Sequence, residues 1–303
     1  ASTIVLLPFL ESQLTALYTP AMEQKKVTIR VPATSGNIGP GFDCLGMALD
    51  WWNDVHMSVS SAPTINVLGE GADTISRTEN NLIYQSAQTL LHEAGEDIQF
   101  LSIECENRIP LARGLGSSAA AIVGGLMAAN ALCTTPLDQH RLIDIAVRLE
   151  GHADNVTPAL LGGCQAVVRD GDRVVSDTVA IAPELMGIVF GPKWPMSTRD
   201  SRDNLTEEVT REDAIYNLGR ITMLVNSLSS GRTENLRVAT QDRLHQPARE
   251  KIFPAMMYIF RAAQDAGAAG VFLSGGGSSI LALATSNFMT NGFEMANAAD
   301  KQG

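Results

Sequence analysis

Cationic residues are scarce in this sequence. Lys and Arg together number 22 against 33 Asp and Glu, so the formal net charge is −11. A protein that binds nucleic acid or anionic lipid usually does so with clustered Lys and Arg, and such a cluster would have to act here against the field of the whole chain. The composition therefore disfavours nucleic-acid binding and membrane-surface binding as general functions.

Cysteine and histidine are few and scattered. The four cysteines form no CxxC pair, and the five histidines show no HExxH or other zinc-ligand spacing. Isolated thiols in a chain of this length are typical of a reducing compartment, not of a disulfide framework. We therefore expect a cytoplasmic protein that has no zinc site.

The sequence also lacks a long hydrophobic run and a cationic leader. The longest apolar stretch, residues 119–132, is rich in Gly and Ala and is interrupted by Asn130. It is shorter than the ~18 residues that a membrane span requires, so we expect no transmembrane segment. Residues 1–24 contain no Lys or Arg, unlike a secretory signal or a transit peptide, and we interpret them as a non-catalytic N-terminal extension.

The remaining composition is that of a folded globular protein, and its length suggests two domains, with one large domain as the alternative. The chain has 303 residues, of which 45% are hydrophobic and 18% are charged. Strand-like and helix-like segments follow one another without regular alternation, which favours α+β layers. Residues 191–195 (GPKWP) carry two prolines and predict a boundary between a first domain, 25–190, and a second domain, 191–303.

Hydrophobic periodicity predicts the individual elements. Residues 27–31 alternate at period two, and the glycine-rich stretch that follows from Ala33 is expected to be a loop. Ser117 and Ser118 are expected to cap a helix that is buried nearly all round. The expected helices are 119–132, 138–149, 211–229, 233–243 and 252–266, and the expected strands are 27–31, 55–59, 65–68, 101–104, 164–168, 174–175, 186–190, 271–273 and 279–284.

Residues 113–120 (RGLGSSAA) form the most informative segment. Glycines allow close backbone approach to a ligand, and the N-terminus of the following helix offers unpaired N–H groups. The pattern predicts a phosphate site, although it matches neither GxxxxGK[ST] nor GxGxxG. The alternative is a tight turn packed against a buried helix.

Two other glycine-rich segments carry polar residues. Residues 274–279 (SGGGSS) lie between two apolar runs, where three glycines indicate close backbone approach or a simple hairpin turn. The loop that follows residues 27–31 presents Asn37 and Asp43, which suit a substrate hydroxyl or ammonium but are also common turn residues.

A polar cluster follows the helix expected at 138–149. Glu150, His152, Asp154 and Asn155 fall within six residues, a density that suits Mg²⁺ or a polar substrate; the alternative is a solvated loop. Arg202 and Arg249 carry guanidinium groups that can bind a carboxylate or phosphate through two hydrogen bonds; the alternative is that they form surface ion pairs.

Five motifs taken together resemble the GHMP family of small-molecule kinases. They are VPATSGNIGPGFDCLGMALD, PLARGLGSSAAAIVGG, EGHADNVTPALLGG, LHQPAR and SGGGSSILAL, and they occur in the family's order from residue 27 to the end. Within the family the chain is most similar to the branch whose substrate is L-homoserine. The resemblance implies a two-domain α+β fold with an N-terminal mixed sheet and helices and a C-terminal ferredoxin-like α/β sandwich. It also implies ATP-dependent phosphorylation of the homoserine hydroxyl in threonine biosynthesis, and homodimers are common in the family.

The resemblance also assigns site residues. The phosphates of ATP would lie over the glycine loop, Mg²⁺ would be held by Ser118 and Glu150, and Asn155 stands where other members have a candidate base, Asp. An amide cannot take a proton at neutral pH, so catalysis would rest on positioning and charge. The nucleotide site would comprise Pro110, Leu111, Ala112, Arg113, Gly114, Leu115, Gly116, Ser117, Ser118, Ala119 and Ala120, and the substrate site Asn37, Asp43, His152, Asp154, Arg202 and Arg249.

The chain departs from the family pattern at a few positions. Gly277 and Ser278 stand where a Gly-Pro pair is usual, Thr206 follows Leu205 in place of Pro, and Ala248 replaces a bulkier residue. Two other functions stay open at this point: a kinase for a different hydroxylated metabolite, and a non-catalytic ligand-binding regulator on the same scaffold. A substrate panel separates the first, and ATP binding without turnover would indicate the second.

Overall fold

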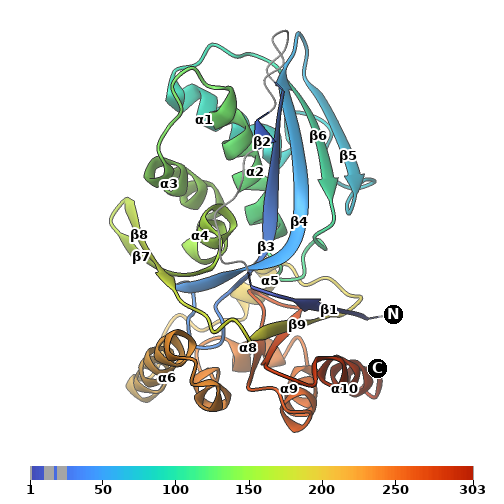
Figure 1. Ribbon diagram of the computed structural model, residues 1–303, viewed down its shortest axis with the longest axis vertical. Helices are drawn as coiled ribbons and strands as arrows, with labels where there is room; N and C mark the ends of the chain where they lie inside the picture. Colours follow the sequence, from blue (N-terminus) through green and yellow to red (C-terminus); the bar gives the residue numbers. More distant parts are fainter. Residues whose placement is uncertain (1, 10–16, 19–25, 303) are drawn as a thin grey trace.

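Two β-sheets organise the chain, one in each half of the molecule (Figure 1). The structure is a computed structural model that describes residues 2–9, 17–18 and 26–302. A seven-stranded sheet with helices on one face forms the larger part, and a four-stranded sheet with helices forms the smaller part. The expected α+β organisation is confirmed.

The larger sheet is built around two long antiparallel strands, β3 (Lys26–Gly36) and β4 (Leu45–Val59). Val27, Ile29 and Val31 are buried at alternate positions, as their period-two pattern predicts. The strand continues through Ala33 to Gly36, so the expectation that a loop begins at Ala33 was wrong: the pairing with β4 holds this segment extended. The other strands of this sheet are β2 (Leu17–Tyr18), β5 (Thr64–Gly69), β6 (Leu101–Asn107), β7 (Cys164–Asp170) and β8 (Arg173–Val179).

Four helices cover one face of the larger sheet: α1 (Leu82–Ala94), α2 (Ser117–Leu132), α3 (Gln139–Glu150) and α4 (Ala153–Leu161). The prediction that α2 is buried nearly all round is confirmed, because its buried residues run from Ala119 to Leu132 on several faces. Helices α1 and α4 were not expected. The sequence signal for α1 was its N-cap residue, Asn81, whose side chain accepts from the amide of Ile83.

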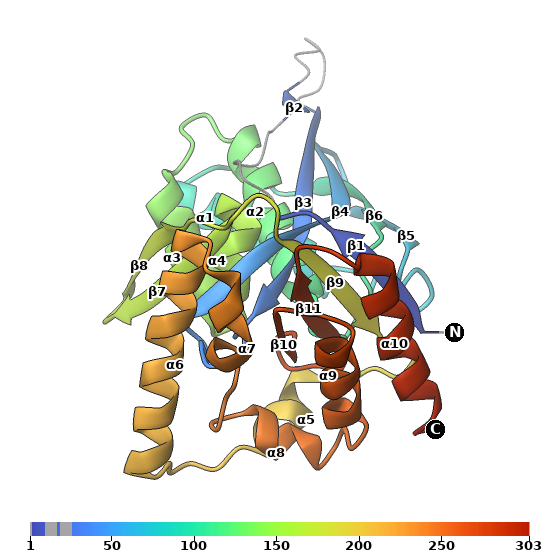
Figure 2. The same cartoon turned by 60° about the horizontal axis from the view of Figure 1, so that its bottom comes forward.

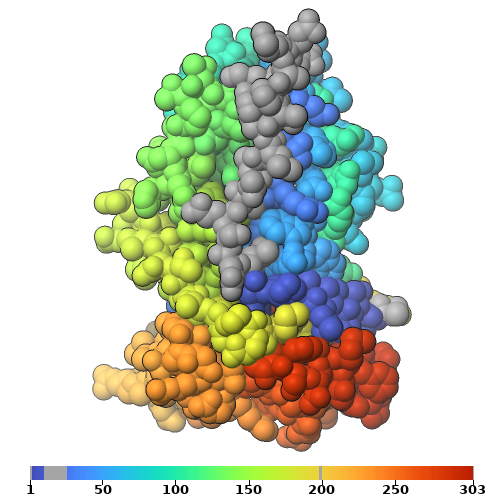
Figure 3. Space-filling model, viewed as in Figure 1, coloured from blue at the N-terminus to red at the C-terminus, as the bar shows by residue number. Residues whose placement is uncertain are grey.

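The smaller sheet has the order β1-β9-β11-β10 and is entirely antiparallel. Its strands are β1 (Thr3–Leu7), β9 (Met186–Gly191), β10 (Gly270–Leu273) and β11 (Ile280–Ala284). Two features differ from the sequence analysis: β1 comes from the segment interpreted as an extension, and β9 lies across the expected boundary at residue 190. In Figure 3 the blue N-terminal strand lies directly against the red C-terminal residues. Residue 1 and residues 10–16 and 19–24 of the expected extension lie outside the described residues.

Helices of the second half flank the smaller sheet (Figure 2). Two of them, α9 (Met256–Asp265) and α10 (Phe288–Asp300), pack beside it, and α10 was not expected. The expected helix 233–243 is divided into a 3-10 turn at Thr233–Asn235 and a short α7 (Leu236–Ala239). The remaining helices are α5 (Thr198–Asp203), α6 (Arg211–Ser230) and α8 (Gln246–Glu250). None of the helices in the described part of the chain is long and apolar enough to span a bilayer.

Candidate active site

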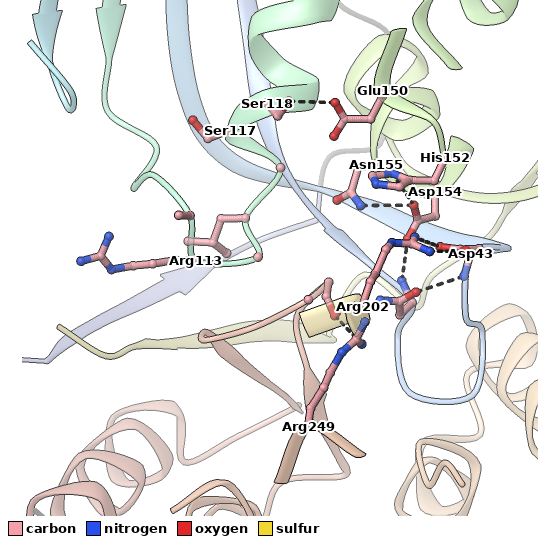
Figure 4. A pocket seen from close by; sticks show the side chains of 17 residues that line it. Asp43, Arg113, Ser117, Ser118, Glu150, His152, Asp154, Asn155, Arg202 and Arg249 are labelled. Carbon is pink, nitrogen blue, oxygen red and sulfur yellow. Dashed lines mark hydrogen bonds and ion pairs between the residues drawn. The ribbon is translucent and has the colours of Figure 1, made fainter. Parts of the chain in front are cut away.

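One pocket collects residues from both halves of the molecule (Figure 4). The larger half contributes the loop after β3, the turn before α2 and the turn between α3 and α4. The smaller half contributes α5, α8 and the turn between β10 and β11. The pocket is lined by Asn37, Asp43, Ala112, Arg113, Gly114, Leu115, Gly116, Ser117, Ser118, Glu150, His152, Asp154, Asn155, Arg202, Arg249, Gly275 and Gly276.

The wall before α2 is a glycine turn that leaves the first amides of the helix open. Gly116 is the N-cap residue of α2, with a φ of 67°, and no side chain caps this end. The expectation that Ser117 and Ser118 cap the helix was therefore wrong, because they are its first two residues. A Cβ on Gly116 would lie 1.9 Å from Thr34 Oγ1, so only glycine fits this position. Unpaired amides at a helix N-terminus favour an anion such as phosphate.

Ser118 and Glu150 lie side by side in the pocket (Figure 4). Ser118 Oγ donates to Glu150 Oε2 at 2.8 Å. Burial raises the pKa of the Glu150 carboxyl, and the Ser118 hydrogen bond opposes that shift. A desolvated carboxylate beside a hydroxyl gains from a nearby cation.

The pair has the chemistry of a Mg²⁺ site. Both groups supply the hard oxygen that Mg²⁺ prefers, and the described residues contain no group of three or more His, Cys, Asp or Glu that could hold a metal unaided. Protein sites for Mg²⁺ commonly use one or two side chains and leave the other positions to phosphate and water. Ser118 and Glu150 therefore fit the ion, provided that a phosphate ligand completes its coordination.

The polar cluster after α3 begins a new helix instead of a solvated loop. His152 is the N-cap residue of α4, and Asp154 and Asn155 lie in the first turn of that helix. Asp154 is 2% exposed, accepts from the Asn37 amide at 3.1 Å and accepts from Asn155 Nδ2 at 3.2 Å. Burial, followed by the charge of Asp43, raises the pKa of Asp154 to about 7. The helix turn thus aims a readily titrated carboxyl into the pocket (Figure 4).

The glycines of β3 and β4 make room for this turn. A Cβ on Gly46 would lie 1.6 Å from the main-chain oxygen of Asp154, and one on Gly36 would lie 2.1 Å from its Oδ2. The backbone of the sheet therefore approaches α4 closely, which fixes the depth at which Asp154 enters the pocket.

Asn155 is tied to the protein through both atoms of its amide. Its Oδ1 accepts from Thr34 Oγ1 at 2.9 Å, and its Nδ2 donates to Asp154. His152 is beside them, with Nδ1 3.6 Å from Asp154 Oδ1, and burial lowers the pKa of the imidazole. Asn155 can therefore orient its neighbours and cannot act as a base.

Arg202 and Asp43 join the two halves by an ion pair. Arg202 Nη2 donates to Asp43 Oδ1 at 2.6 Å, and Nη1 donates to Oδ2 at 3.2 Å. Asn37 supports this aspartate because its Oδ1 accepts from the Asp43 amide at 3.0 Å. Both charged side chains are about one third exposed, so the pair faces the open side of the pocket.

Arg249 is a buried cation in the site. It is 1% exposed, and its Nη1 donates to the carbonyl oxygen of Gly275 at 3.2 Å. Nε has no hydrogen-bond partner within the described chain. Burial, followed by the charge of Arg202, lowers the pKa of this guanidinium to about 10, so it stays cationic at neutral pH. A buried arginine with an unused donor is suited to an anionic ligand.

The SGGGSS segment is the turn between β10 and β11, and it also packs against the glycine turn before α2, which we call the phosphate turn for the ligand that the sequence predicts there. Ser274 Oγ donates to the carbonyl oxygen of Gly114 at 2.6 Å, and the Ser279 amide donates to the carbonyl oxygen of Arg113 at 3.0 Å. A Cβ on Gly114 would lie 2.0 Å from the carbonyl oxygen of Ser274. The two glycine turns therefore brace each other across the halves.

Five residues of the expected nucleotide segment do not present side chains to this pocket. Ala119 and Ala120 are buried inside α2, and Pro110 and Leu111 precede the turn without lining the pocket. The guanidinium of Arg113 turns away (Figure 4), because it donates to the carbonyl oxygens of Leu111, Pro192 and Lys193. Arg113 thus joins the turn to the 191–195 segment, and only its backbone faces the site.

Three residues that support the site were missed. Thr34 binds Asn155, the ring of Phe42 lies beneath the guanidinium groups of Arg202 and Arg249, and His245 contacts Arg249. The signal for His245 was available, because it precedes Arg249 by four residues within LHQPAR and shares a helix face with it. Thr34 and Phe42 gave no signal of their own beyond their place in the glycine-rich stretch.

The chain is similar to known small-molecule kinases over most of its length. The family model of the GHMP kinases N terminal domain matches residues 81–163, and that of the GHMP kinases C terminal matches residues 226–288. A homoserine kinase of Moorella thermoacetica is 41% identical over 275 residues, which cover 91% of this chain and 93% of that protein. A homoserine kinase of Desulfitobacterium hafniense is 44% identical over 261 residues, covering 86% of this chain and 88% of that protein.

Solved structures show the same arrangement of the two halves. The crystal structure of homoserine kinase from Cytophaga hutchinsonii has a TM-score of 0.85 and 30% identity, and the alignment covers 95% of this chain and 94% of that one. A mevalonate kinase of L. major in complex with R-mevalonate has a TM-score of 0.71 at 16% identity over 94% of this chain and 95% of that one, which shows a shared fold alone.

Proposed function

The chain belongs to the homoserine kinases of the GHMP kinase family, and from this premise we propose that it transfers the γ-phosphoryl group of ATP to the hydroxyl of L-homoserine. The product is O-phospho-L-homoserine, and the reaction is a step of threonine biosynthesis. The two-domain GHMP kinase fold expected from the motifs is confirmed by the family models and by the structural similarity. Membership also makes the chain an ATP-dependent small-molecule kinase.

One observation carries the assignment of roles: a single pocket places an anion-binding turn opposite a charged grip for an amino acid. The turn before α2 offers backbone amides to the phosphates of ATP. Across the pocket, two arginines and two aspartates supply both signs of charge, as a zwitterionic substrate requires.

The substrate grip, which consists of Asp43, Asp154, Arg202 and Arg249, is proposed to bind L-homoserine by exchange of ion-pair partners. Arg202 and Asp43 hold each other in the absence of substrate. A homoserine zwitterion can enter between them, so that its carboxylate binds Arg202 and Arg249 while its ammonium binds Asp43 and Asp154. Each charge is then matched again after binding, which limits the cost of taking these groups out of water. The substrate hydroxyl is left to face the phosphate turn.

The phosphates of ATP are proposed to accept hydrogen bonds from the first amides of α2 and to bind a Mg²⁺ ion held by Ser118 and Glu150. When bound, the ion would neutralise charge that develops on the phosphate oxygens. Ser118 supplies a neutral oxygen and Glu150 an anionic one, and their mutual hydrogen bond holds both on the same side of the turn. The protein residues therefore orient ATP before reaction.

Asn155 does not serve as a base on the substrate hydroxyl in this proposal, because an amide takes up no proton at neutral pH and both of its polar atoms are bonded to Thr34 and Asp154. In the proposed transfer the hydroxyl oxygen forms a bond to the γ-phosphorus, and the bond from this phosphorus to the bridging oxygen of ADP breaks. The hydroxyl proton passes to a phosphoryl oxygen or to solvent. Rate enhancement then comes from positioning and charge stabilisation.

A product assay tests this function. Purified protein with MgATP is expected to release ADP and form O-phosphohomoserine with L-homoserine, and to show little turnover with mevalonate, galactose, L-serine or no acceptor. Galactose offers no carboxylate to Arg202 and Arg249, and mevalonate offers no ammonium to Asp43 and Asp154. L-Serine carries both charges, but its hydroxyl lies one methylene closer to them and so falls short of the phosphate turn. If mevalonate or galactose were turned over as fast as L-homoserine or faster, L-homoserine would not be the preferred substrate. If ATP bound but no acceptor stimulated ADP release, the result would contradict kinase activity.

The affinity for L-homoserine is expected to depend on pH through Asp154. Its pKa is raised to about 7, so lowering the pH below that value protonates the carboxylate that is proposed to bind the ammonium. The KM for homoserine should therefore fall roughly tenfold between about pH 6 and about pH 8, in proportion to the ionised fraction. Initial rates across this range measure it, with the KM for ATP as reference. An Asp154→Asn variant should show a weaker but nearly pH-independent affinity, and an unchanged pH slope in that variant would exclude Asp154 as the titrating group.

The compartment and the assembly also remain proposals. All four cysteines, Cys44, Cys105, Cys133 and Cys164, are free thiols, which supports the cytoplasm as the working compartment. The homodimer that the resemblance implies stays a prediction, to be measured by light scattering.

A further inference from the structure

A buried histidine connects the two sides of the substrate grip. His245 immediately precedes α8 and is 0% exposed. Its Nε2 lies 2.7 Å from the carbonyl oxygen of Gly39, in the loop that carries Asn37 and Asp43. Its Nδ1 lies 2.5 Å from Nη1 of Arg249, one helical turn further along. One imidazole thus contacts both the loop of the larger half and the arginine of the smaller half.

The two partners of His245 assign its proton. A carbonyl oxygen can only accept, so Nε2 must carry hydrogen and donate to Gly39. A guanidinium can only donate, so Nδ1 must hold a lone pair and accept from Arg249. Both contacts require the same neutral tautomer, and burial keeps the ring neutral by lowering the pKa of His245 to about 4.

The hydrogen bonds recorded for the Arg249 guanidinium both start from Nη1, toward His245 and Gly275. This nitrogen is therefore held from the protein side, and Nε has no partner within the described chain. Without the acceptor on His245, the Gly275 contact alone would hold the guanidinium, and the nearby positive charge of Arg202 would favour its displacement.

An aromatic ring completes the support. Phe42 and His245 have ring centroids 5.4 Å apart, and the guanidinium carbons of Arg202 and Arg249 lie 5.4 Å and 5.8 Å from the centre of the Phe42 ring. The face of an aromatic ring attracts cations, so Phe42 keeps two like charges near each other. His245 fixes one of those cations and also the loop on which Phe42 lies.

We infer that His245 is a positioning residue for substrate recognition: its Nδ1 accepts from Arg249 and holds this arginine where it can meet the substrate carboxylate. This inference rests on the proposed function, because it takes L-homoserine as the ligand. His245 touches neither substrate nor ATP in this role, and it acts through Arg249. It is therefore a determinant of specificity for a ligand that carries a carboxylate.

Two amide substitutions separate the two hydrogen bonds of His245. The amide oxygen of Asn lies near the place of Nδ1 and can accept from Arg249, whereas the amide nitrogen of Gln lies near the place of Nε2 and can donate to Gly39. We expect His245→Gln to raise the KM for L-homoserine about 10- to 100-fold, the range for losing a hydrogen bond to a charged group, while His245→Asn stays within about threefold of wild type. The KM for ATP should change less than about twofold in both, since the phosphate turn is not in contact with His245.

A carboxylate-free acceptor provides the specific readout. Turnover of 3-aminopropan-1-ol, which keeps the hydroxyl and the ammonium, should be equally low in wild type, His245→Gln and His245→Asn, because Arg249 has no carboxylate to meet. Equal KM values of His245→Gln and His245→Asn for homoserine, or parallel rises in the KM for homoserine and for ATP, would overturn the inference. Thermal unfolding of each variant controls for loss of the fold.

A crystal structure of the His245→Gln variant gives a result that does not depend on turnover. The expected result is a displaced Arg249 guanidinium, and an unchanged guanidinium would overturn the inference on its own. If wild type forms no phosphohomoserine, the proposed function fails, while the position of Arg249 in this variant still decides the role of His245.

Discussion

Replacement of Glu150 by Gln is expected to lower kcat about 1,000-fold with little change in the fold. Gln keeps the size of the side chain and its amide oxygen can still accept from Ser118 Oγ, so the local hydrogen bond survives. The negative charge is lost, and with it the attraction for the cation that the phosphates require. Steady-state rates at saturating ATP and L-homoserine over a series of Mg²⁺ concentrations measure the effect, and the Mg²⁺ requirement should rise in the variant.

A matched control is available on the surface. Glu184 is exposed and distant in sequence from the pocket residues, and Glu184→Gln removes the same charge from the chain. This control should keep wild-type kcat and the wild-type Mg²⁺ requirement. If Glu150→Gln retained kcat within about tenfold with an unchanged Mg²⁺ dependence, the carboxylate would not be a ligand of the ion.

The phosphate turn could be predicted from the sequence because its signal is local. Residues 113–118 contain the glycines and the helix start within a single turn, and chemistry that depends on adjacent backbone amides is visible in adjacent residues. The error concerned the cap, since serine commonly caps a helix through its side chain. Here Gly116 takes the cap position, because Thr34 of β3 leaves no space for a side chain.

The substrate grip could be assigned only through the resemblance. Asp43 and Arg202 are 159 residues apart in the sequence, and no periodicity indicates that their side chains meet. The same holds for Asn37 and Asp154, which are joined by one amide across 117 residues. These contacts depend on how the two halves pack, so the sequence alone indicated residue types suited to a zwitterion and no geometry.

The N-terminal strand illustrates a different limit. Residues 4–7 are apolar, but they lie in the segment that was interpreted as an extension, and their partner β9 begins 179 residues after Leu7. An edge strand is placed by its partner, and period-two patterns do not identify that partner. The helix α4 was missed for another reason: a polar first turn resembles a loop when the burial of Asp154 is unknown.

Replacement of Arg249 by Ala is expected to lower kcat/KM for L-homoserine about 1,000-fold, the range for truncating a buried, hydrogen-bonded charge. Arg249→Lys should recover only part of this loss, because an ammonium keeps the charge but lacks the planar fork that meets both His245 and a carboxylate. Competition assays with 3-aminopropan-1-ol should show no comparable loss.

The control for Arg249 is Arg243→Ala, since Arg243 lies in the same segment but pairs with Glu212 and Asp213 at the surface. It should keep kcat/KM within about twofold, as is usual for exposed ion pairs. The contrast follows from burial: Arg249 is 1% exposed, so neither water nor a neighbouring side chain can replace its charge after truncation. If Arg249→Ala lost ATP affinity and homoserine affinity equally, the arginine would serve the phosphates, and recognition of the substrate carboxylate would fall to Arg202.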